Sequence, residues 1–232
     1  MELRADAARN RAAIVGAARE VFAEHGLDVP LDEIARRAGT GNATLYRRFR
    51  TRGDLVAAVF AEGMSEHLEA VEAGLADPDP WDGFCSYVRA VGAMQARDRG
   101  IADLVTMDVS SAPDIEGLRA RAFKGLVRLV RRAHEAGVLR ADFTTEDVVL
   151  LMMANAGLIE RSHDMTQAAS GRLVHLLLDG FRASAATDGP AAPSPTATRR
   201  AMVRNGQHRL GSGGHRRLNH PPQPTKQPGE TP

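Results

Sequence analysis

The segment Leu31–Asp54, LDEIARRAGTGNATLYRRFRTRGD, decides how this chain folds. Apolar residues at helical spacing predict a first short helix over Leu31–Ala38, which a glycine ends. A second short helix over Asn42–Phe49 buries Leu45 and Phe49, four residues apart, and leaves its other side chains mostly polar. Two short helices around a tight turn are typical of proteins that insert side chains into the DNA major groove.

The residues on either side predict two more helices that complete this unit. Apolar residues recur at helical spacing over 7–25, and Gly26 is suited to end that helix. On the other side, Thr51 is a good N-cap for a helix that continues to about residue 75. We therefore expect a DNA-binding domain over residues 7–60, with its fourth helix continuing to about 75.

The rest of the chain divides into a helical region and a tail. The sequence ADPDP at 76–80 interrupts the fourth helix and marks a boundary. From Thr187 onward, prolines replace large apolar residues, so we expect a disordered basic tail over 187–232. Between them, the sequence predicts a second domain over 80–186, with helices over 81–96, 100–109, 113–136, 145–161 and 165–185.

The composition fits an all-α protein. Aromatic residues make up only 4% of the 232 residues, and no run alternates as a half-buried strand does. The lone Cys85 excludes an internal disulfide and a multi-cysteine metal site. No signal peptide is apparent, and the longest apolar stretch is shorter than the ~20 residues that a membrane span needs. We expect a cytoplasmic protein.

Charge is distributed unevenly, although the net charge of the chain is only +1. Residues 1–60 hold ten arginines and eight acidic residues, a net charge of +2. Residues 61–188 hold 13 basic and 20 acidic residues, a net charge of −7, and residues 189–232 hold seven basic residues and one acidic residue, a net charge of +6. Only part of the molecule is therefore suited to face a polyanion.

Several motifs resemble the TetR family of helix-turn-helix regulators. The matching stretches are VFAEHG ending the first helix, PLDEIARRAG at 30–39, ATLYRRF at 43–49 and RGDL at 52–55. The resemblance covers about residues 9–60; beyond residue 75 only the number and length of the helices agree. It implies a homodimeric regulator, usually a repressor, that a small molecule releases from a palindromic operator. Two departures are Thr40, where the family commonly has valine, and Arg50, where it often has proline.

The second short helix is the predicted recognition element. Asn42 is suited to pair with adenine, and Ala43 to contact a thymine methyl group. The resemblance implies DNA contacts by Thr44 and Tyr46 and a phosphate contact by Arg52. Alternatively, Asn42 is an N-cap, Tyr46 packs against the first helix, and the arginines are solvated. The predicted DNA-contacting set is Thr40, Asn42, Ala43, Thr44, Tyr46, Arg47, Arg48 and Arg52.

The second domain contains the residues that we expect to bind a ligand or a second subunit. The family resemblance implies a ligand cavity in this domain. The candidates for lining it are Met64, Phe84, Tyr87, Met107 and Phe123; the alternative is that they belong to the core. The last two helices are apolar almost all round, which favours a four-helix dimer interface, although burial within one subunit also explains it. For that interface the candidates are Leu151, Ile159, Leu173, Leu177 and Phe181.

Nothing in the sequence favours catalysis. None of the eight histidines has metal-ligand spacing, and no glycine-rich phosphate loop is present. We therefore expect no enzyme activity, no metal and no cofactor, and the expected partners are double-stranded operator DNA, a small-molecule effector and a second copy of the chain, with no membrane. The alternative function is an all-α ligand-binding or assembly protein that does not bind a specific operator.

Overall fold

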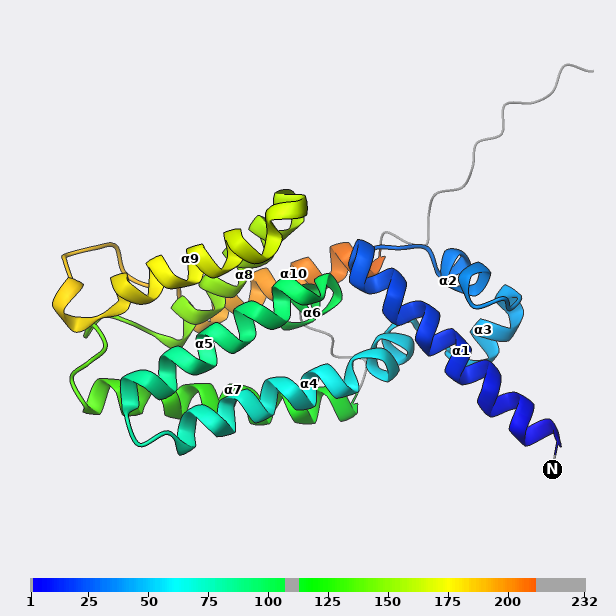
Figure 1. Cartoon of the computed structure of the whole chain (residues 1–232), viewed down its shortest axis with the longest axis horizontal. Coiled ribbons are helices and arrows are strands. Elements are labelled where there is room, and N and C mark those ends of the chain that lie inside the picture. Colours follow the sequence, from blue (N-terminus) through cyan, green and yellow to red (C-terminus); the bar gives the residue numbers. More distant parts are fainter. Residues whose placement is uncertain (1, 107–112, 212–232) are drawn as a thin grey trace, which may run out of the picture.

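A computed structural model describes residues 2–106 and 113–211, and throughout these ranges the regular elements are helices (Figure 1). The helices form two lobes: a small one at the N-terminus and a larger bundle that contains most of the rest of the chain. Within the described ranges, no helix combines the length and apolar character that a membrane crossing requires. The all-α fold class that the sequence predicts is confirmed.

The small lobe consists of α1 (Glu2–His25), α2 (Leu31–Arg37) and α3 (Asn42–Arg48). Positive backbone φ angles of 76° and 64° at the glycines after α1 and α2 allow the chain to turn sharply there. Apolar side chains from all three helices meet in one core, as the spacing predicts. This core includes Ile14, Phe22, Ile34, Leu45 and Phe49.

Helix α4 (Arg52–Ala76) joins the two lobes. A capping box fixes its start: the Asp54 amide donates to Thr51 Oγ1 at 3.1 Å, and the Thr51 amide donates to the Asp54 carboxylate at 3.0 Å. The first half of the helix, up to Met64, is buried in the core of the small lobe. The second half, with Leu68 and Val71, is buried in the core of the larger lobe.

The larger lobe surrounds the second half of α4. Helix α4 lies against α5 (Pro80–Arg97) and α7 (Pro113–Glu135), while α6 (Arg99–Thr106) contacts both α1 and α8. Helix α8 (Thr145–Ser162) is connected by the short 3-10 helix η1 (His163–Met165) to α9 (Thr166–Phe181), which lies against α5 and α8, and η2 (Ala183–Ala185) follows. The guanidinium of Arg182 lies 4.4 Å from the centroid of the Trp81 ring, so the end of α9 is held at the start of α5.

The structure differs from the sequence prediction after residue 187. Instead of disorder, residues Pro195–Gly211 form helix α10, which contacts α8. The hydroxyl of Ser194 accepts a hydrogen bond from the Ala197 amide at 3.2 Å at the start of this helix. Its polar sequence has almost no amphipathic pattern, so the packing that orders it was not apparent from the residues alone. The remainder of the predicted tail, 212–232, lies outside the described residues.

Helices α4 and α5 approach each other closely at a pair of glycines. A Cβ atom added to Gly83 would lie 2.2 Å from the carbonyl oxygen of Gly74, and Gly83 is buried. We predict that Gly83→Ala lowers the free energy of unfolding by about 1–3 kcal/mol, because backbone atoms must shift to admit the methyl group. Urea denaturation measures the change.

The matched control is Gly16→Ala on α1. A Cβ atom at Gly16 would meet nothing within 4 Å, so this change should be neutral or should stabilise by up to ~1 kcal/mol through helix propensity. Equal effects of the two substitutions would contradict the close helix contact.

Candidate nucleic-acid interface and ligand cavity

Helix α3 presents its polar side chains on the outside of the small lobe. Leu45 is fully buried, whereas Tyr46 retains 50% of its surface. Gly41 occupies the N-cap position and no side chain caps the helix, so Asn42 does not have the capping role considered as an alternative. The remaining predicted DNA-contacting residues of this helix are exposed or half-buried: Asn42, Ala43, Thr44, Arg47 and Arg48.

Arg52, for which the family resemblance implies a phosphate contact, also makes a contact within the protein. Its side chain is half-buried, and Nη1 donates to the carbonyl oxygen of Leu27 at 2.7 Å. Burial lowers the pKa of the Arg52 guanidinium, and the nearby Asp28 and Tyr46 oppose that shift. One nitrogen of the guanidinium therefore holds the loop between α1 and α2. The contact of Arg52 with phosphate stays a prediction.

The same loop is held from the other side by the larger lobe. The Leu27 amide donates to Asp103 Oδ2 at 2.8 Å, and Asp103 is buried in α6. The amide and carbonyl of one residue thus connect α6 to the start of α4. Asp103 was not among the predicted site residues; an acid within the apolar run of this helix was the signal in the sequence.

Thr40, one of the two departures from the family pattern, lies in the turn before α3. Its Oγ1 atom is buried and has no hydrogen-bond partner among the described residues. A buried hydroxyl without a partner has lost its hydration and gained nothing in exchange. The turn forms in spite of this cost.

A cavity of about 430 Å³ lies in the larger lobe, with α4, α5, α7, α8 and α10 around it. Met64, Tyr87 and Phe123 line it, as the sequence predicts. Phe84 does not, and that prediction is wrong: the ring is fully buried, with its centroid 5.7 Å from that of Phe143. Met107 lies outside the described residues.

One polar pair in the cavity wall joins α4 to α5. His67 Nε2 lies 3.1 Å from the Tyr87 hydroxyl. Burial, with a smaller contribution from Arg119, lowers the pKa of His67 to about 4, and burial raises the pKa of Tyr87. Both groups are therefore uncharged at neutral pH. His67 was not predicted, although it follows Met64 by three residues on the same helix face.

The dimer candidates divide by burial. Leu151 and Ile159 are each 3% exposed, because this face of α8 packs within the subunit against α5, α6 and α9. These two side chains are therefore wrong as interface candidates. Leu173, Leu177 and Phe181 of α9 are half-buried, and the last two pack on the core of the larger lobe.

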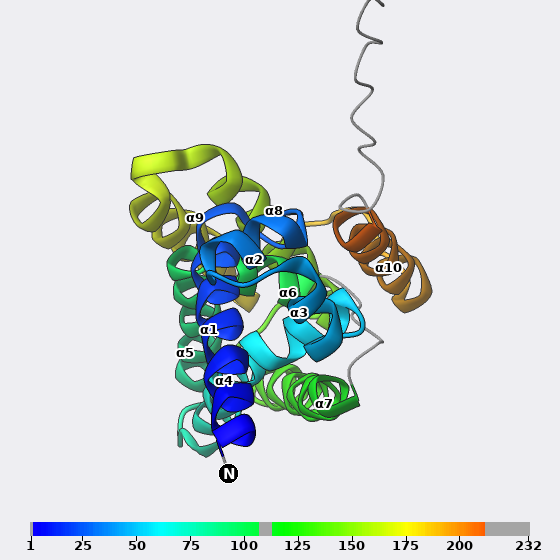
Figure 2. The same cartoon turned by 90° about the vertical axis from the view of Figure 1, so that its right-hand side faces the viewer.

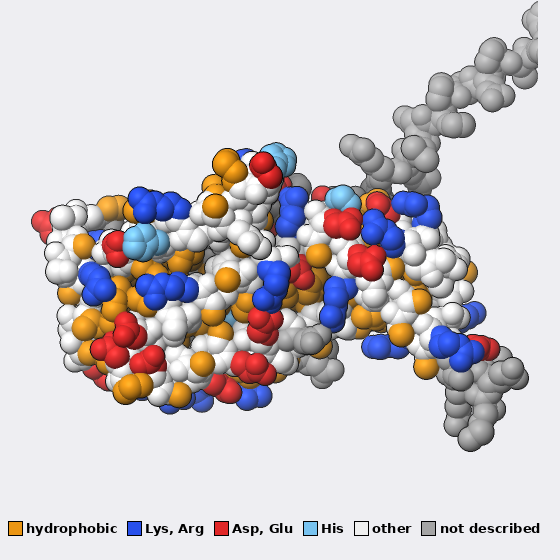
Figure 3. All heavy atoms as spheres, in the orientation of Figure 1, with side chains coloured by type: hydrophobic (Ala, Val, Ile, Leu, Met, Phe, Trp, Pro, Cys, Tyr) orange, Lys and Arg blue, Asp and Glu red, His pale blue; other side chains and the backbone are white. Residues whose placement is uncertain are grey.

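Apolar side chains that remain exposed lie elsewhere on these two helices. Leu150, 42% exposed, is followed at helical spacing by Ala154 and Leu158, and Leu176 of α9 is 50% exposed. Figure 3 shows exposed apolar side chains over the projecting turn between α8 and α9 as well. These three residues, Leu150, Ala154 and Leu158, form the outward stripe of α8. It is offset by one residue from the predicted interface residues Leu151 and Ile159.

The described residues show neither a metal-binding cluster nor an activated thiol. Among them, no group of three or more histidine, cysteine or acidic side chains is placed to hold a metal ion. Cys85 is buried, and burial raises the pKa of its thiol to about 11, so it carries little thiolate at neutral pH.

A short polar helix presented by a three-helix scaffold, joined to a helical bundle with a cavity, defines a helix-turn-helix DNA-binding regulator. Residues 14–59 match the model "Bacterial regulatory proteins, tetR family", and residues 79–183 match "Transcriptional regulator SbtR-like, C-terminal domain". The chain belongs to the TetR family of transcriptional regulators. The family is not enzymatic, which agrees with the sequence prediction.

Several solved structures of transcriptional regulators are similar to this chain. The regulator SCO0520 from Streptomyces coelicolor is 32% identical, with 74% of this chain and 98% of that chain covered and a TM-score of 0.47. A TetR-family protein from Rhodococcus RHA1 is 23% identical, with 77% and 98% covered and a TM-score of 0.55. FadR from Bacillus subtilis, solved in complex with stearoyl-CoA, is 17% identical, with 73% and 98% covered and a TM-score of 0.53. No curated protein sequence matches this chain at a significant level.

The unpartnered hydroxyl of Thr40 leads to a stability prediction. Thr40→Val replaces it with a methyl group of nearly the same size, so the free energy of unfolding should rise by about 1 kcal/mol. Thr40→Ser keeps the hydroxyl and should give no gain. Urea denaturation of both variants measures these changes in the free energy of unfolding. A destabilised Thr40→Val protein would mean that the hydroxyl has a hydrogen-bond partner in solution.

Proposed function

We propose that this protein is a homodimeric repressor that a small-molecule effector releases from a palindromic operator. The observation that carries the proposal is the path of α4. Met64 and His67 of this helix line the cavity, and its first residue, Arg52, follows the recognition helix after a turn of three residues. A ligand in the cavity therefore contacts the same rigid element that positions α3.

The DNA-facing part of the proposal rests on the exposed side chains of α3. Asn42 and Ala43 are suited to read base edges, and Tyr46 and Arg47 to contact phosphates. In a dimer, two such helices must lie about 34–36 Å apart to enter successive major grooves. A two-fold symmetric protein then requires an operator with two inverted half-sites.

The dimer interface that we propose combines α8 and α9 of both subunits. Its apolar contacts come from the outward stripe of Leu150, Ala154 and Leu158 and from Leu173 and Leu176. Two helices from each subunit form a four-helix interface, in which these side chains lose their exposure to water.

Release is explained by differential affinity. A ligand that binds better to a subunit geometry with the wrong spacing of the two α3 helices lowers the affinity for DNA by the same coupling free energy. The Asp103–Leu27–Arg52 hydrogen bonds provide a second route besides α4 itself, because they connect α6 to the loop before α2. Val105 of the same helix lines the cavity.

FadR from Bacillus subtilis, in complex with stearoyl-CoA, is a case in which this fold binds a small molecule. At 17% identity the likeness concerns the fold. It supports a ligand-binding role for the larger lobe here and does not carry that ligand over to this chain.

Operator binding is tested with the DNA that flanks the gene and a random duplex of equal length. We predict that Tyr46→Ala weakens binding to the flanking DNA about 5–30-fold, since a charge-assisted hydrogen bond to phosphate is lost. Arg47→Ala should lower the slope of log affinity against log salt by about 1. Fluorescence anisotropy at several salt concentrations measures both.

Arg131→Ala is the matched control, because this exposed arginine lies on α7 in an ion pair with Glu135 at 3.6 Å. It should leave DNA affinity unchanged. Wild-type protein that binds the flanking DNA no better than random DNA would refute the proposal and favour the ligand-binding or assembly alternative.

The connection through Leu27 is tested separately. Asp103→Ala removes the acceptor of the Leu27 amide, so that amide should exchange its hydrogen about 5–150-fold faster, corresponding to the ~1–3 kcal/mol lost with a buried partner. Operator affinity should fall in parallel. Asp164→Ala, at an exposed position of η1, is the control, and an unchanged Leu27 exchange rate in Asp103→Ala would contradict the connection.

A further inference from the structure

We propose that α10 is a wall of the effector cavity and that this cavity takes an uncharged, largely apolar small molecule. The inference rests on the proposed function only in treating the cavity as the effector site. It concerns a part of the chain beyond the matched regions, because the C-terminal family model ends at residue 183 and α10 begins at Pro195.

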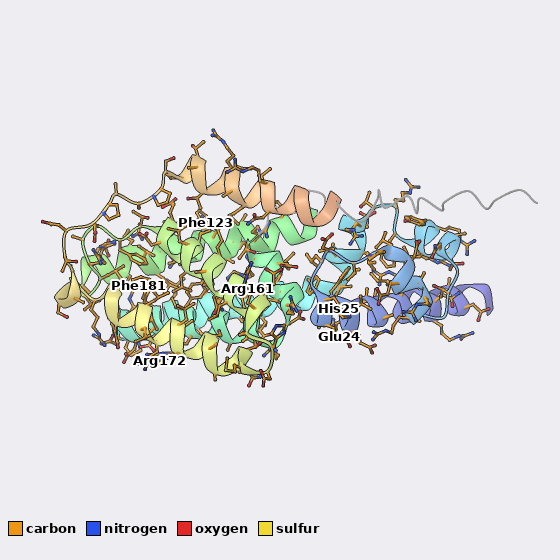
Figure 4. All side chains as sticks on the ribbon, turned by 90° about the horizontal axis from the view of Figure 1, so that it is seen from above. Glu24, His25, Phe123, Arg161, Arg172 and Phe181 are labelled. Atoms are coloured by element: carbon orange, nitrogen blue, oxygen red, sulfur yellow. The ribbon has the colours of Figure 1, made fainter. Side chains whose placement is uncertain are left out.

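Helix α10 contributes several residues to the cavity wall. Pro195, Thr198, Arg199 and Met202 line the cavity together with Phe123 of α7. Figure 2 shows α10 on the outer side of the bundle, and in Figure 4 Phe123 lies beside it. The cavity is therefore bordered on this side by a helix that follows the family domain.

The burial pattern of α10 indicates that one face of the helix is directed inward. Thr198 is only 7% exposed and Met202, one turn later, is half-buried, whereas Thr196 and Arg200 are exposed. Residues four apart share one face of a helix. The helix thus turns the face with Thr198 and Met202 to the cavity and the face with Thr196 and Arg200 to water.

Among the described residues that line the cavity, the charges balance: there are two arginines, Arg119 and Arg199, and two glutamates, Glu116 and Glu146. His67 adds no charge at neutral pH, since burial lowers its pKa to about 4. A charged ligand would lose its hydration without meeting an excess of opposite charge, and such a transfer is strongly unfavourable.

Most of the remaining wall is apolar, with isolated polar groups. Besides the His67–Tyr87 pair, the buried atoms His67 Nδ1 and Thr198 Oγ1 have no hydrogen-bond partner within the described residues. A hydroxyl or carbonyl group on the ligand that reached one of them would remove the cost of leaving it unpaired. A volume of about 430 Å³ lies within the range of small-molecule sites.

The ligand class is tested with two dyes that share one aromatic skeleton. N-phenyl-1-naphthylamine is uncharged, and 8-anilinonaphthalene-1-sulfonate adds one sulfonate. We expect the full-length protein to bind the uncharged dye at least about tenfold more tightly, because only the sulfonate must be desolvated in a neutral cavity. Equal affinities, a preference for the anion, or no binding of the uncharged dye would overturn the proposed ligand class.

The role of α10 is tested with tryptophan substitutions on its two faces. Thr198→Trp fills the cavity from the inward face and should weaken binding of the uncharged dye at least about tenfold. Thr196→Trp makes the same change on the outer face and should not affect binding. Met202→Glu, which adds a charge to the wall, is a second variant and should also weaken binding. If the inward-face variants bound the dye as tightly as Thr196→Trp does, the placement of α10 in the cavity wall would be overturned.

The outcomes separate this inference from the proposed function. Without dye, wild type and Thr196→Trp, which changes only the outer face of α10, should bind the flanking DNA equally well. Failure of the dye predictions with normal operator binding would overturn the α10 wall or the ligand class alone. Normal dye results with DNA binding no better than to a random duplex would overturn the repressor proposal and leave the cavity assignment standing.

Discussion

The structure depends on α4 being one uninterrupted rod that is buried in two cores. Its 25 residues span ~37 Å at 1.5 Å per residue, so it begins three residues after α3 and continues into the larger lobe. Phe60 and Met64 pack in the first core, and Val71 packs in the second. Buried side chains pack only in discrete arrangements. A rotation of α4 in one lobe therefore requires its side chains in the other lobe to repack as well.

Contacts with α6 add a second connection between the lobes. The Leu27 amide and carbonyl are bonded to α6 and α4, so one residue of the small lobe is held by both helices. The ring of Phe60, on α4, also packs closely against Gly100 of α6. A Cβ atom added to Gly100 would lie 2.3 Å from that ring. The two lobes are therefore connected through α1, α4 and α6 together.

The helices could be predicted from the sequence because helical periodicity, glycine stops and caps are local signals. Facing was harder. Leu151 and its outward neighbour Leu150 differ by one position on a helix that is apolar almost all round, and only packing against α5 and α6 decides which is buried. The hydrogen bond of Arg52 to Leu27 and the packing of helix α10 on α8 could not be predicted for a related reason: these partners are distant in sequence and leave no periodic pattern.

The contact between Arg182 and Trp81 has a practical consequence for spectroscopy. Trp81 is the single tryptophan of the chain, and a cation lies 4.4 Å from its ring centroid at the junction of α5 and the end of α9. Intrinsic emission of the unmodified protein therefore originates at one site, next to a helix of the proposed dimer interface. Displacement of α9 would change the electric field at the indole and shift its emission, so the proposed association of subunits through α9 would have an optical signal without any label.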